Sequence, residues 1–83
     1  MSAWIENTSQ LEKTFTFDSF ESAMHFMQKA SLTISELDHH PTWTNTYNRI
    51  HIVLSTHDAG NTVTQKDWEL ARELDVIFAQ MKG

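Results

Sequence analysis

Residues 37–58 read LDHHPTWTNTYNRIHIVLSTHD, and the one proline of the chain separates two kinds of local pattern in this stretch. Pro41 disfavours helical dihedrals at the residue before it, His40. A helix that arrives from the N-terminal side should therefore end near His39, and residues 39–41 should form an irregular corner. Loops of this kind present their side chains to solvent or to a ligand.

Two runs of β-branched and aromatic residues follow the corner, residues 43–47 and residues 50–56. Such runs are typical of strands, and Asn48-Arg49 between them predicts a tight hairpin turn. Alternate residues of a strand point to opposite faces of the sheet. One face of the second strand should hold Ile50, Ile52 and Leu54, and the other should hold His51, Val53, Ser55 and, if the strand runs that far, His57.

Earlier in the chain, Leu11, Phe15 and Phe17 recur at even spacing, with polar residues on the other parity. This period of two predicts a half-buried strand. Residues 4–6 are expected to pair with that strand as a hairpin, through a turn at residues 7–9. The sequence thus predicts one hairpin before a long helix and another after it.

Two helices are predicted from a start signal followed by apolar residues at helical spacing. Asp18 with Glu21 has the pattern of a capping box, and so does Thr64 with Asp67. The first helix should begin at about Ser19 and carry an apolar stripe of Phe20, Ala23, Met24, Met27, Ala30, Ile34 and Leu37. The second should carry Leu70, Ala71, Leu74, Ile77, Phe78 and Met81.

The expected element order, ββαββα, indicates the α+β class: a four-stranded, mostly antiparallel sheet with two helices packed on one face. Residues 1–83 are too few for two independently stable cores, so they are expected to form a single domain. The second face of the sheet is then left for a partner or another subunit. Because a core of this size is marginal, association with further copies of the chain is expected.

Composition excludes several classes of function. The chain has no cysteine, which excludes disulfides, thiolate catalysis and zinc sites with cysteine ligands. It has 6 Lys and Arg residues against 11 Asp and Glu, and a formal charge of −5, a balance that repels nucleic acids and anionic membranes. No targeting segment or long apolar run occurs. We expect a cytoplasmic protein that binds neither nucleic acid nor membrane.

Three of the five histidines, His39, His40 and His57, lie at predicted element ends and not in the apolar stripes. Imidazole has an ordinary pKa of about 6.5 and can both donate and accept protons near neutral pH. Each histidine also has a structural interpretation: the pair can be a solvated helix end, and His57 an exposed strand end. The structural interpretation of Asp67 is a helix cap, a role that it can combine with a functional one. His25 and His51 are expected at the surface.

Taken together, these residues resemble the signature of the pterin-4a-carbinolamine dehydratases. The matching positions are Asp38-His39-His40-Pro41, Tyr47, Ser55-Thr56-His57-Asp58 and Asp67. Trp4, the strand over residues 11–17 and the order of elements also resemble the family, so the likeness covers nearly the whole chain. Ser35 stands where the family pattern commonly has an acidic residue, and Glu36 or Asp38 is the expected substitute. The loop from His57 to Asp67 is one residue longer than in animal members, and we do not expect the helix that those members carry ahead of the first strand.

The resemblance implies removal of water from a 4a-hydroxytetrahydropterin to give the quinonoid dihydropterin, as in tetrahydrobiopterin recycling. It implies His39 and His57 as proton donors and His40 as the residue that holds the pterin. The other residues expected to line the pocket are Asp38, Ser55, Thr56 and Asp58, and Asp67 is expected to orient the site. The resemblance implies no metal or organic cofactor, and a homodimer or homotetramer.

Two other classes of function stay open. Three histidines with an aspartate can in principle hold zinc or iron, although adjacent histidine side chains diverge unless the backbone bends between them. Alternatively, the chain could keep the dehydratase fold and act as a dimerisation or assembly partner. A protein that only binds has no physical need for all three histidines, so their presence favours the enzyme.

Overall fold

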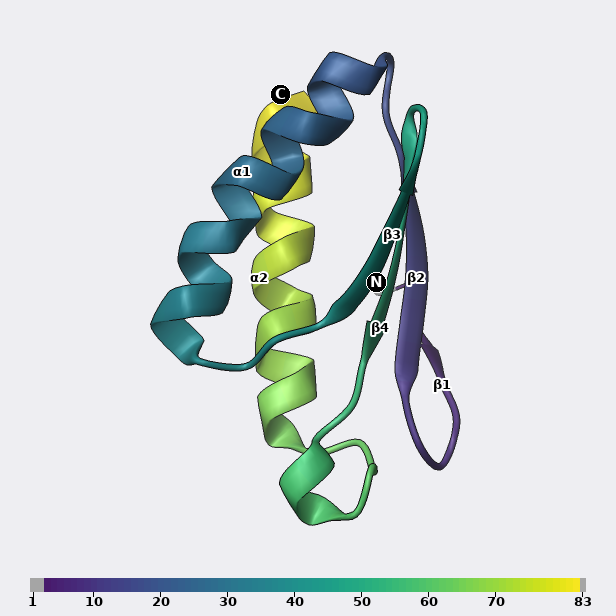
Figure 1. Ribbon diagram of the computed structural model, residues 1–83, viewed down its shortest axis with the longest axis vertical. Coiled ribbons are helices and arrows are strands. Elements are labelled where there is room, and N and C mark those ends of the chain that lie inside the picture. Colours follow the sequence, from purple (N-terminus) through teal and green to yellow (C-terminus); the bar gives the residue numbers. More distant parts are fainter. Residues whose placement is uncertain (1–2, 83) are drawn as a thin grey trace.

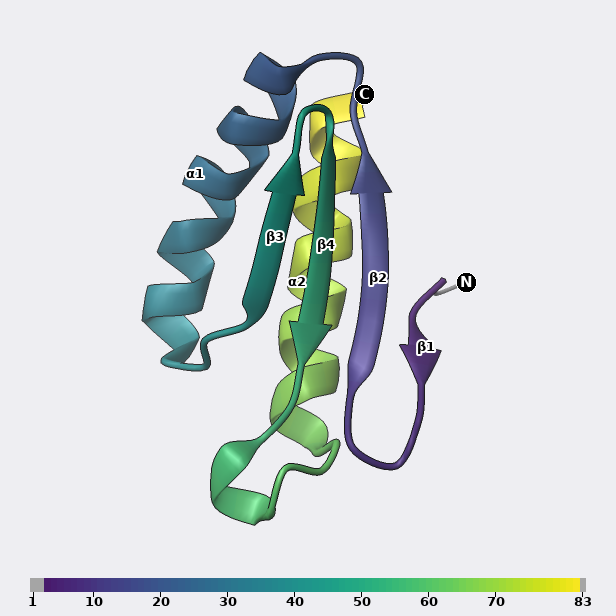
Figure 2. The ribbon, with the colours of Figure 1, turned by 45° about the vertical axis from the view of Figure 1, so that its right-hand side comes forward.

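The computed structural model describes residues 3–82, Lys82 by its backbone alone. The strands are β1 (Ile5–Glu6), β2 (Leu11–Thr16), β3 (Thr42–Thr46) and β4 (Arg49–Leu54), and the helices are α1 (Phe20–Leu37), the short 3₁₀ helix η1 (His57–Ala59) and α2 (Gln65–Lys82). The strands form one sheet in the order β1-β2-β4-β3, with every pairing antiparallel (Figure 2). Both long helices cover the same face of that sheet (Figure 1). The predicted fold class is therefore confirmed.

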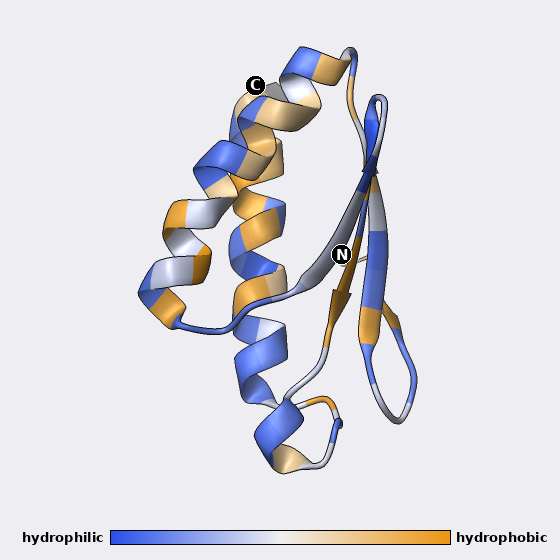
Figure 3. Ribbon diagram, in the orientation of Figure 1, coloured by the Kyte–Doolittle hydropathy of each residue, from blue (hydrophilic) through white to orange (hydrophobic). Residues whose placement is uncertain are grey.

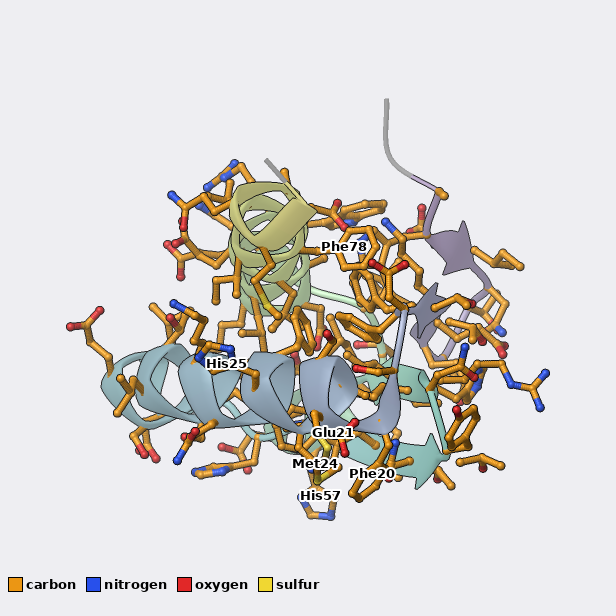
Figure 4. All side chains as sticks on the ribbon, turned by 90° about the horizontal axis from the view of Figure 1, so that it is seen from above. Phe20, Glu21, Met24, His25, His57 and Phe78 are labelled. Carbon is orange, nitrogen blue, oxygen red and sulfur yellow. The ribbon has the colours of Figure 1, made fainter. Side chains whose placement is uncertain are left out.

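Four phenylalanines tie the sheet to both helices. The ring centroids of Phe15 and Phe78 lie 4.9 Å apart, and the ring of Phe26 from α1 lies 5.1 Å from that of Phe15 and 5.2 Å from that of Phe17. Figure 4 shows Phe78 on the side of α2 that faces the other core rings. Tilted and edge-to-face ring pairs of this kind each contribute about 0.5–1.5 kcal/mol beyond their buried area. The remaining large buried side chains of the core are Leu11, Ile50, Ile52, Leu54, Leu70 and Leu74.

The stripe predicted for α1 was wrong at two positions. Phe26 is fully buried although the predicted stripe omitted it, and Phe20, which the stripe included, is 42% exposed. Phe20 is the first residue of α1, where the helix projects beyond the end of the sheet (Figure 1). The face of a helix that is buried depends on its angle to the sheet, which spacing along the sequence does not supply.

The capping box predicted at Asp18 and Glu21 was also wrong. The N-cap of α1 is Ser19, whose hydroxyl accepts a hydrogen bond from the backbone N–H of Ser22 at 3.1 Å. Phe17, two residues before this N-cap, is held in line with β2 because its N–H donates to the carbonyl of Asn48 at 2.8 Å. The chain therefore stays extended one residue longer than the capping pattern indicates.

The turn between β3 and β4 lies one residue earlier than predicted. Thr46 pairs with Arg49, so Tyr47 and Asn48 form the turn and Arg49 already belongs to β4. Tyr47 adopts a left-handed φ of 54°. The side chain of Asn45 stabilises this turn by donating to the carbonyl oxygens of Tyr47 and Arg49, both at 3.1 Å. The strand faces are nevertheless as predicted, because Ile50, Ile52 and Leu54 are all buried.

The sheet face that the helices leave open is polar. Its side chains include a histidine and a glutamate, His51 and Glu12, whose Nε2 and Oε1 atoms lie 3.3 Å apart. His51 Nδ1 also lies 2.8 Å from the hydroxyl of Thr14 on the neighbouring strand.

The large exposed apolar side chains of the described residues, apart from Ile5 and Tyr47, lie on the two long helices. They are Phe20, Leu32, Trp68 and Val76. Figure 3 shows the contrast between hydrophilic and hydrophobic positions along the ribbon.

A polar contact joins Trp4, the residue before β1, to α2. The indole Nε1 of Trp4 donates to both carboxylate oxygens of Asp75, at 3.2 and 3.1 Å. Lys13 Nζ lies 2.7 Å from the same carboxylate and 4.6 Å from the centroid of the Phe15 ring. Trp4 is thereby held in the core at 8% exposure although β1 itself has only two residues.

Candidate active site

The corner after α1 turns the chain so that His39 faces α2. Asp38 ends the helix in a left-handed conformation, with a φ of 50°, and its N–H donates to the carbonyl of Ser35 at 3.2 Å. The N–H of His39 reaches back to the carbonyl of Ile34. This pair of bonds satisfies carbonyls that a helix end leaves without partners. The predicted corner at residues 39–41 is confirmed as irregular chain between α1 and β3.

The second segment of the site begins where β4 ends at Leu54, two residues earlier than expected. Thr56 pairs with Thr62 as an isolated bridge, and its N–H donates to the carbonyl of Thr62 at 2.9 Å. The bridge closes a loop that contains η1, so His57 begins a 3₁₀ helix and is not part of the strand. Gly60 ends η1 with a φ of 81°, a conformation that glycine adopts without strain.

Asp67 is the point where these segments meet. Its side chain is fully buried, with Oδ1 2.7 Å from Nε2 of His39. Its other oxygen, Oδ2, accepts from the hydroxyl of Thr56 at 2.7 Å and from the backbone N–H of Thr64 at 2.8 Å. The bond from Thr64 is one half of the predicted capping box, so Asp67 combines the helix cap with a contact to the corner. The polar groups of this buried carboxylate are all paired.

The other predicted site residues lie outside this buried cluster. The side chains of His40 and His57 are 67% and 91% exposed, and each lies near an exposed carboxylate, Asp38 at 3.6 Å and Asp58 at 3.8 Å. Figure 4 shows His57 at the periphery, with its ring directed away from the core. The hydroxyl of Ser55 donates to the carbonyl of Ser9 at 2.8 Å, which directs it toward the first hairpin.

The structure thus brings together His39, Thr56 and Asp67, and it adds Thr64. The hydroxyl oxygens of Thr56 and Thr64 lie only 2.6 Å apart. Sequence reasoning treated Thr64 as a helix cap alone, because its spacing to Asp67 explains it completely at that level. The sequence did place Thr56 at the end of a predicted strand, close to the candidate site. The contact between Thr56 and Thr64, however, depends on how the loop of residues 57–63 closes.

A hollow of about 480 Å³ adjoins the cluster on the side of η1. Its size is in the range of small-molecule sites. It is lined by Thr56, Asp58, Ala59, Thr64, Gln65, Lys66 and Glu69. No histidine of the described chain is among these residues, so the hollow lies beside His39 and not around it.

A second hollow, of about 500 Å³, lies at the other side of α2 and is bordered by Trp4, Lys13, Trp68 and Asp75, among others. Its polar groups are largely engaged with one another, because Asp75 accepts from both Trp4 and Lys13. The described residues that line this hollow include no histidine, so we place the candidate active site at His39 and Asp67.

Within residues 3–82, no group of three or more histidine, aspartate or glutamate side chains is arranged to hold a metal ion. No helix in that range has the length and apolar character needed to cross a bilayer. The groups that this site offers for chemistry are the imidazole of His39 and the buried carboxylate of Asp67 that holds it. This pairing fixes the orientation of the ring, and an imidazole held in this way can exchange protons with a bound substrate.

Comparison with known proteins was consistent in sequence and in structure. A family model described as pterin 4 alpha carbinolamine dehydratase matches residues 1–77. A protein of Opitutus terrae is 47% identical over 77 residues, which cover 93% of this chain and 79% of that protein. One from Bradyrhizobium sp. strain ORS 278 is 44% identical over 85 residues, which cover 100% and 84% of the two chains. Both names assign those proteins provisionally as pterin-4-alpha-carbinolamine dehydratases.

Two solved structures share the fold. The transcriptional coactivator/pterin dehydratase from Brucella melitensis superposes with a TM-score of 0.84 at 38% identity, covering 89% of this chain and 80% of the other. A pterin dehydratase-like protein identified as a RuBisCO assembly factor in the α-carboxysome gives a TM-score of 0.77 at 20% identity, covering 93% and 90%. The second likeness shows the fold alone. With a family model that spans most of its length and relatives above 40% identity, this chain belongs to the pterin 4 alpha carbinolamine dehydratase family.

Proposed function

We propose that the protein removes water from a 4a-hydroxytetrahydropterin and releases the quinonoid dihydropterin, with histidines as general acids. The proposal extends the activity named for the relatives to this chain. The observation that carries it is the 2.7 Å contact between His39 Nε2 and the fully buried carboxylate of Asp67. A fold used only for binding has no need to bury a carboxylate against an imidazole.

The reaction needs a proton for a poor leaving group. The lone pair of pterin N5 forms a double bond to C4a while the C4a–O bond breaks, and the hydroxyl leaves as water after it accepts a proton from an imidazolium. The N5 proton passes to solvent or to a neutral imidazole, so protons and charge balance. General acid catalysis contributes about 10²- to 10⁴-fold to such a step.

We assign His39 and His57 as the proton donors and His40 as the residue that holds the pterin ring. The exposure of His40 and His57 is compatible with these roles, because groups that meet a substrate must be accessible before it binds. Asp38, Thr56 and Asp58 are proposed to line the substrate with them, and Asp67 to orient His39. For Ser55, only a contribution through its backbone fits the hydroxyl contact with Ser9.

An assembly role is the alternative, because the RuBisCO assembly factor shares this fold. Its 20% identity carries no information on the activity of this chain. The retained His39, His40 and His57, together with the buried Asp67, favour the dehydratase. A folded preparation of the unmodified chain that shows no dehydratase activity would favour the assembly role.

The test is a coupled assay with enzymatically generated 4a-hydroxytetrahydropterin. Appearance of the quinonoid product is followed with the purified protein, without it, and with His39→Ala. We expect a clear acceleration by the unmodified chain and a loss of most of it in the variant. Equal rates with and without the protein would contradict the proposal.

We also propose that the chain associates into a homodimer or homotetramer. Small cores are marginal, and exposed apolar side chains favour contact with a partner. The polar character of the open sheet face makes the helices the better surface for such contact. Leu32 and Val76 are 74% and 44% exposed, and they lie on α1 and α2.

A further inference from the structure

The hydrogen bonds around Asp67 have only one consistent direction. The hydroxyl of Thr56 donates its single proton to Oδ2 of Asp67 at 2.7 Å. Because a threonine hydroxyl has one proton, the 2.6 Å contact between Thr56 and Thr64 must be a donation from Thr64 to Thr56. The oxygen of Thr64 in turn accepts from the backbone N–H of Lys66 at 3.3 Å. The order of donation is therefore Lys66, Thr64, Thr56 and Asp67.

The same reasoning on donors and acceptors determines which ring nitrogen of His39 carries the hydrogen that faces Asp67. Oδ2 of Asp67 accepts two hydrogen bonds. A carboxylate has no hydrogen to donate, so with Asp67 ionised the hydrogen between Oδ1 and His39 Nε2 belongs to the histidine. Among the described residues, none makes a hydrogen bond to His39 Nδ1. With the side chain 12% exposed, Nδ1 is the ring atom left for proton exchange with a substrate.

We infer that Thr64 is a positioning residue for His39, acting through Thr56 and Asp67 to hold the imidazole with Nε2–H on Asp67 and Nδ1 toward the substrate. The hydroxyl of Thr64 fixes that of Thr56, and the backbone N–H of Thr64 binds Oδ2 directly. Oδ1 is thus kept in line with Nε2. This inference deepens the proposed function and rests on it for any effect on catalysis, whereas the state of the imidazole can be tested independently.

A helix cap is the structural alternative for Thr64, and the two roles respond differently to substitution. Thr64→Val removes the hydroxyl with little change in shape, and Thr64→Ser retains it. Ser19→Ala is the matched control, because it removes a hydroxyl cap from α1, whose contact is with Ser22 and not with the site. Loss of an N-cap costs about 1 kcal/mol in either helix, so stability alone does not separate the roles.

Nitrogen-15 NMR of the histidine rings, recorded on the whole chain at a pH where the imidazoles are neutral, reports the tautomer directly. We expect His39 in the unmodified chain and in Thr64→Ser and Ser19→Ala to be the Nε2–H tautomer. Thr64→Val should give a mixture of tautomers or a faster-exchanging Nε2 proton. An Nδ1–H tautomer in the unmodified chain, or a spectrum of Thr64→Val identical to that of the unmodified chain, would overturn the inference.

The kinetic measurement compares the kcat of each variant with the kcat of the unmodified chain, with 4a-hydroxytetrahydropterin as substrate. Thr64→Val should lower kcat about tenfold with little change in KM, because misplacement of a general acid affects the chemical step. Thr64→Ser and Ser19→Ala should stay within about twofold. If Thr64→Val does not fold, Thr56→Val tests the same relay by the same two readouts. If the unmodified chain is inactive, the proposed function fails while the tautomer still decides the positioning role.

Discussion

His39 and Asp67 are 28 positions apart in the sequence, and their side chains meet at 2.7 Å between Nε2 and Oδ1. The contact joins the corner after α1 to the first turn of α2. It is also the only close pairing of an imidazole with a fully buried carboxylate among the described residues. The experiments on this protein follow from the different environments of its histidines and carboxylates.

His39→Ala and His57→Ala are each expected to reduce dehydration by more than about tenfold, because each removes a proposed proton donor. His57 is 91% exposed, so its replacement should leave the unfolding midpoint unchanged. The measurement is the coupled assay with circular dichroism on the same samples. His25→Ala is the control, since Figure 4 shows His25 and His57 on opposite sides of α1. Unchanged turnover in both variants would remove these histidines from the mechanism.

Asp67→Asn is expected to lower activity by at least about tenfold and the free energy of unfolding by about 1–3 kcal/mol. An amide places an N–H₂ group against partners that all donate, which leaves buried donors unpaired. Urea denaturation and the coupled assay measure the two effects. Asp18→Asn, at an exposed position before α1, should alter neither. An Asp67→Asn protein with full activity would show that the carboxylate has a structural role only.

Phe26→Ala should lower the free energy of unfolding by about 3–5 kcal/mol, because it opens a cavity among the rings of Phe15, Phe17 and Phe78. Phe20→Ala removes a ring that is 42% exposed and should cost less than about 1 kcal/mol. Chemical denaturation compares the two on the same helix. Equal losses would contradict the assignment of the buried face of α1.

Size-exclusion chromatography with light scattering should show at least a dimer at micromolar concentration. Val76→Lys, on the exposed surface of α2, is expected to weaken association, whereas Thr44→Lys on the open sheet face should not. A monodisperse monomer of the unmodified chain would contradict the proposed oligomer. Dissociation by Thr44→Lys alone would move the interface from the helices to the sheet.

Removal of metal ions should leave dehydration unaffected. The proposed step uses imidazole and carboxylate groups alone. The measurement is turnover after exhaustive treatment with a chelator, together with metal analysis of the purified protein. Stoichiometric, tightly bound zinc whose removal abolishes turnover would favour the metal-site alternative.

Much of this architecture could be predicted from local patterns. Pro41 marks the corner, and the alternation of Ile50, Ile52 and Leu54 gives the buried face of β4. Spacing also predicted that Asp67 takes part in the cap of α2, which the bond from the Thr64 N–H confirms. Each of these inferences depends only on residues close together in the sequence, where a proline, a period or a capping pattern has a direct physical meaning.

The errors concern contacts between distant segments. The start of α1 shifted because Asn48 holds Phe17 in an extended conformation. His57 lies in η1 because Thr56 pairs with Thr62 instead of continuing β4. The hydrogen bonds that run from Thr64 through Thr56 to Asp67 also join separate segments, and they were not predicted. The capping pattern already explained Thr64 and Asp67 locally.

The bonds between Trp4 and Asp75 join positions 71 residues apart. During synthesis, most of α2 must therefore leave the ribosome before the indole can meet its acceptor. Until then β1, with two paired residues, has little to hold it against β2. The native packing of Trp4 should consequently form only after Asp75 has left the ribosome, and a nascent chain stalled before Asp75 should be readily cleaved by proteases near its first strand.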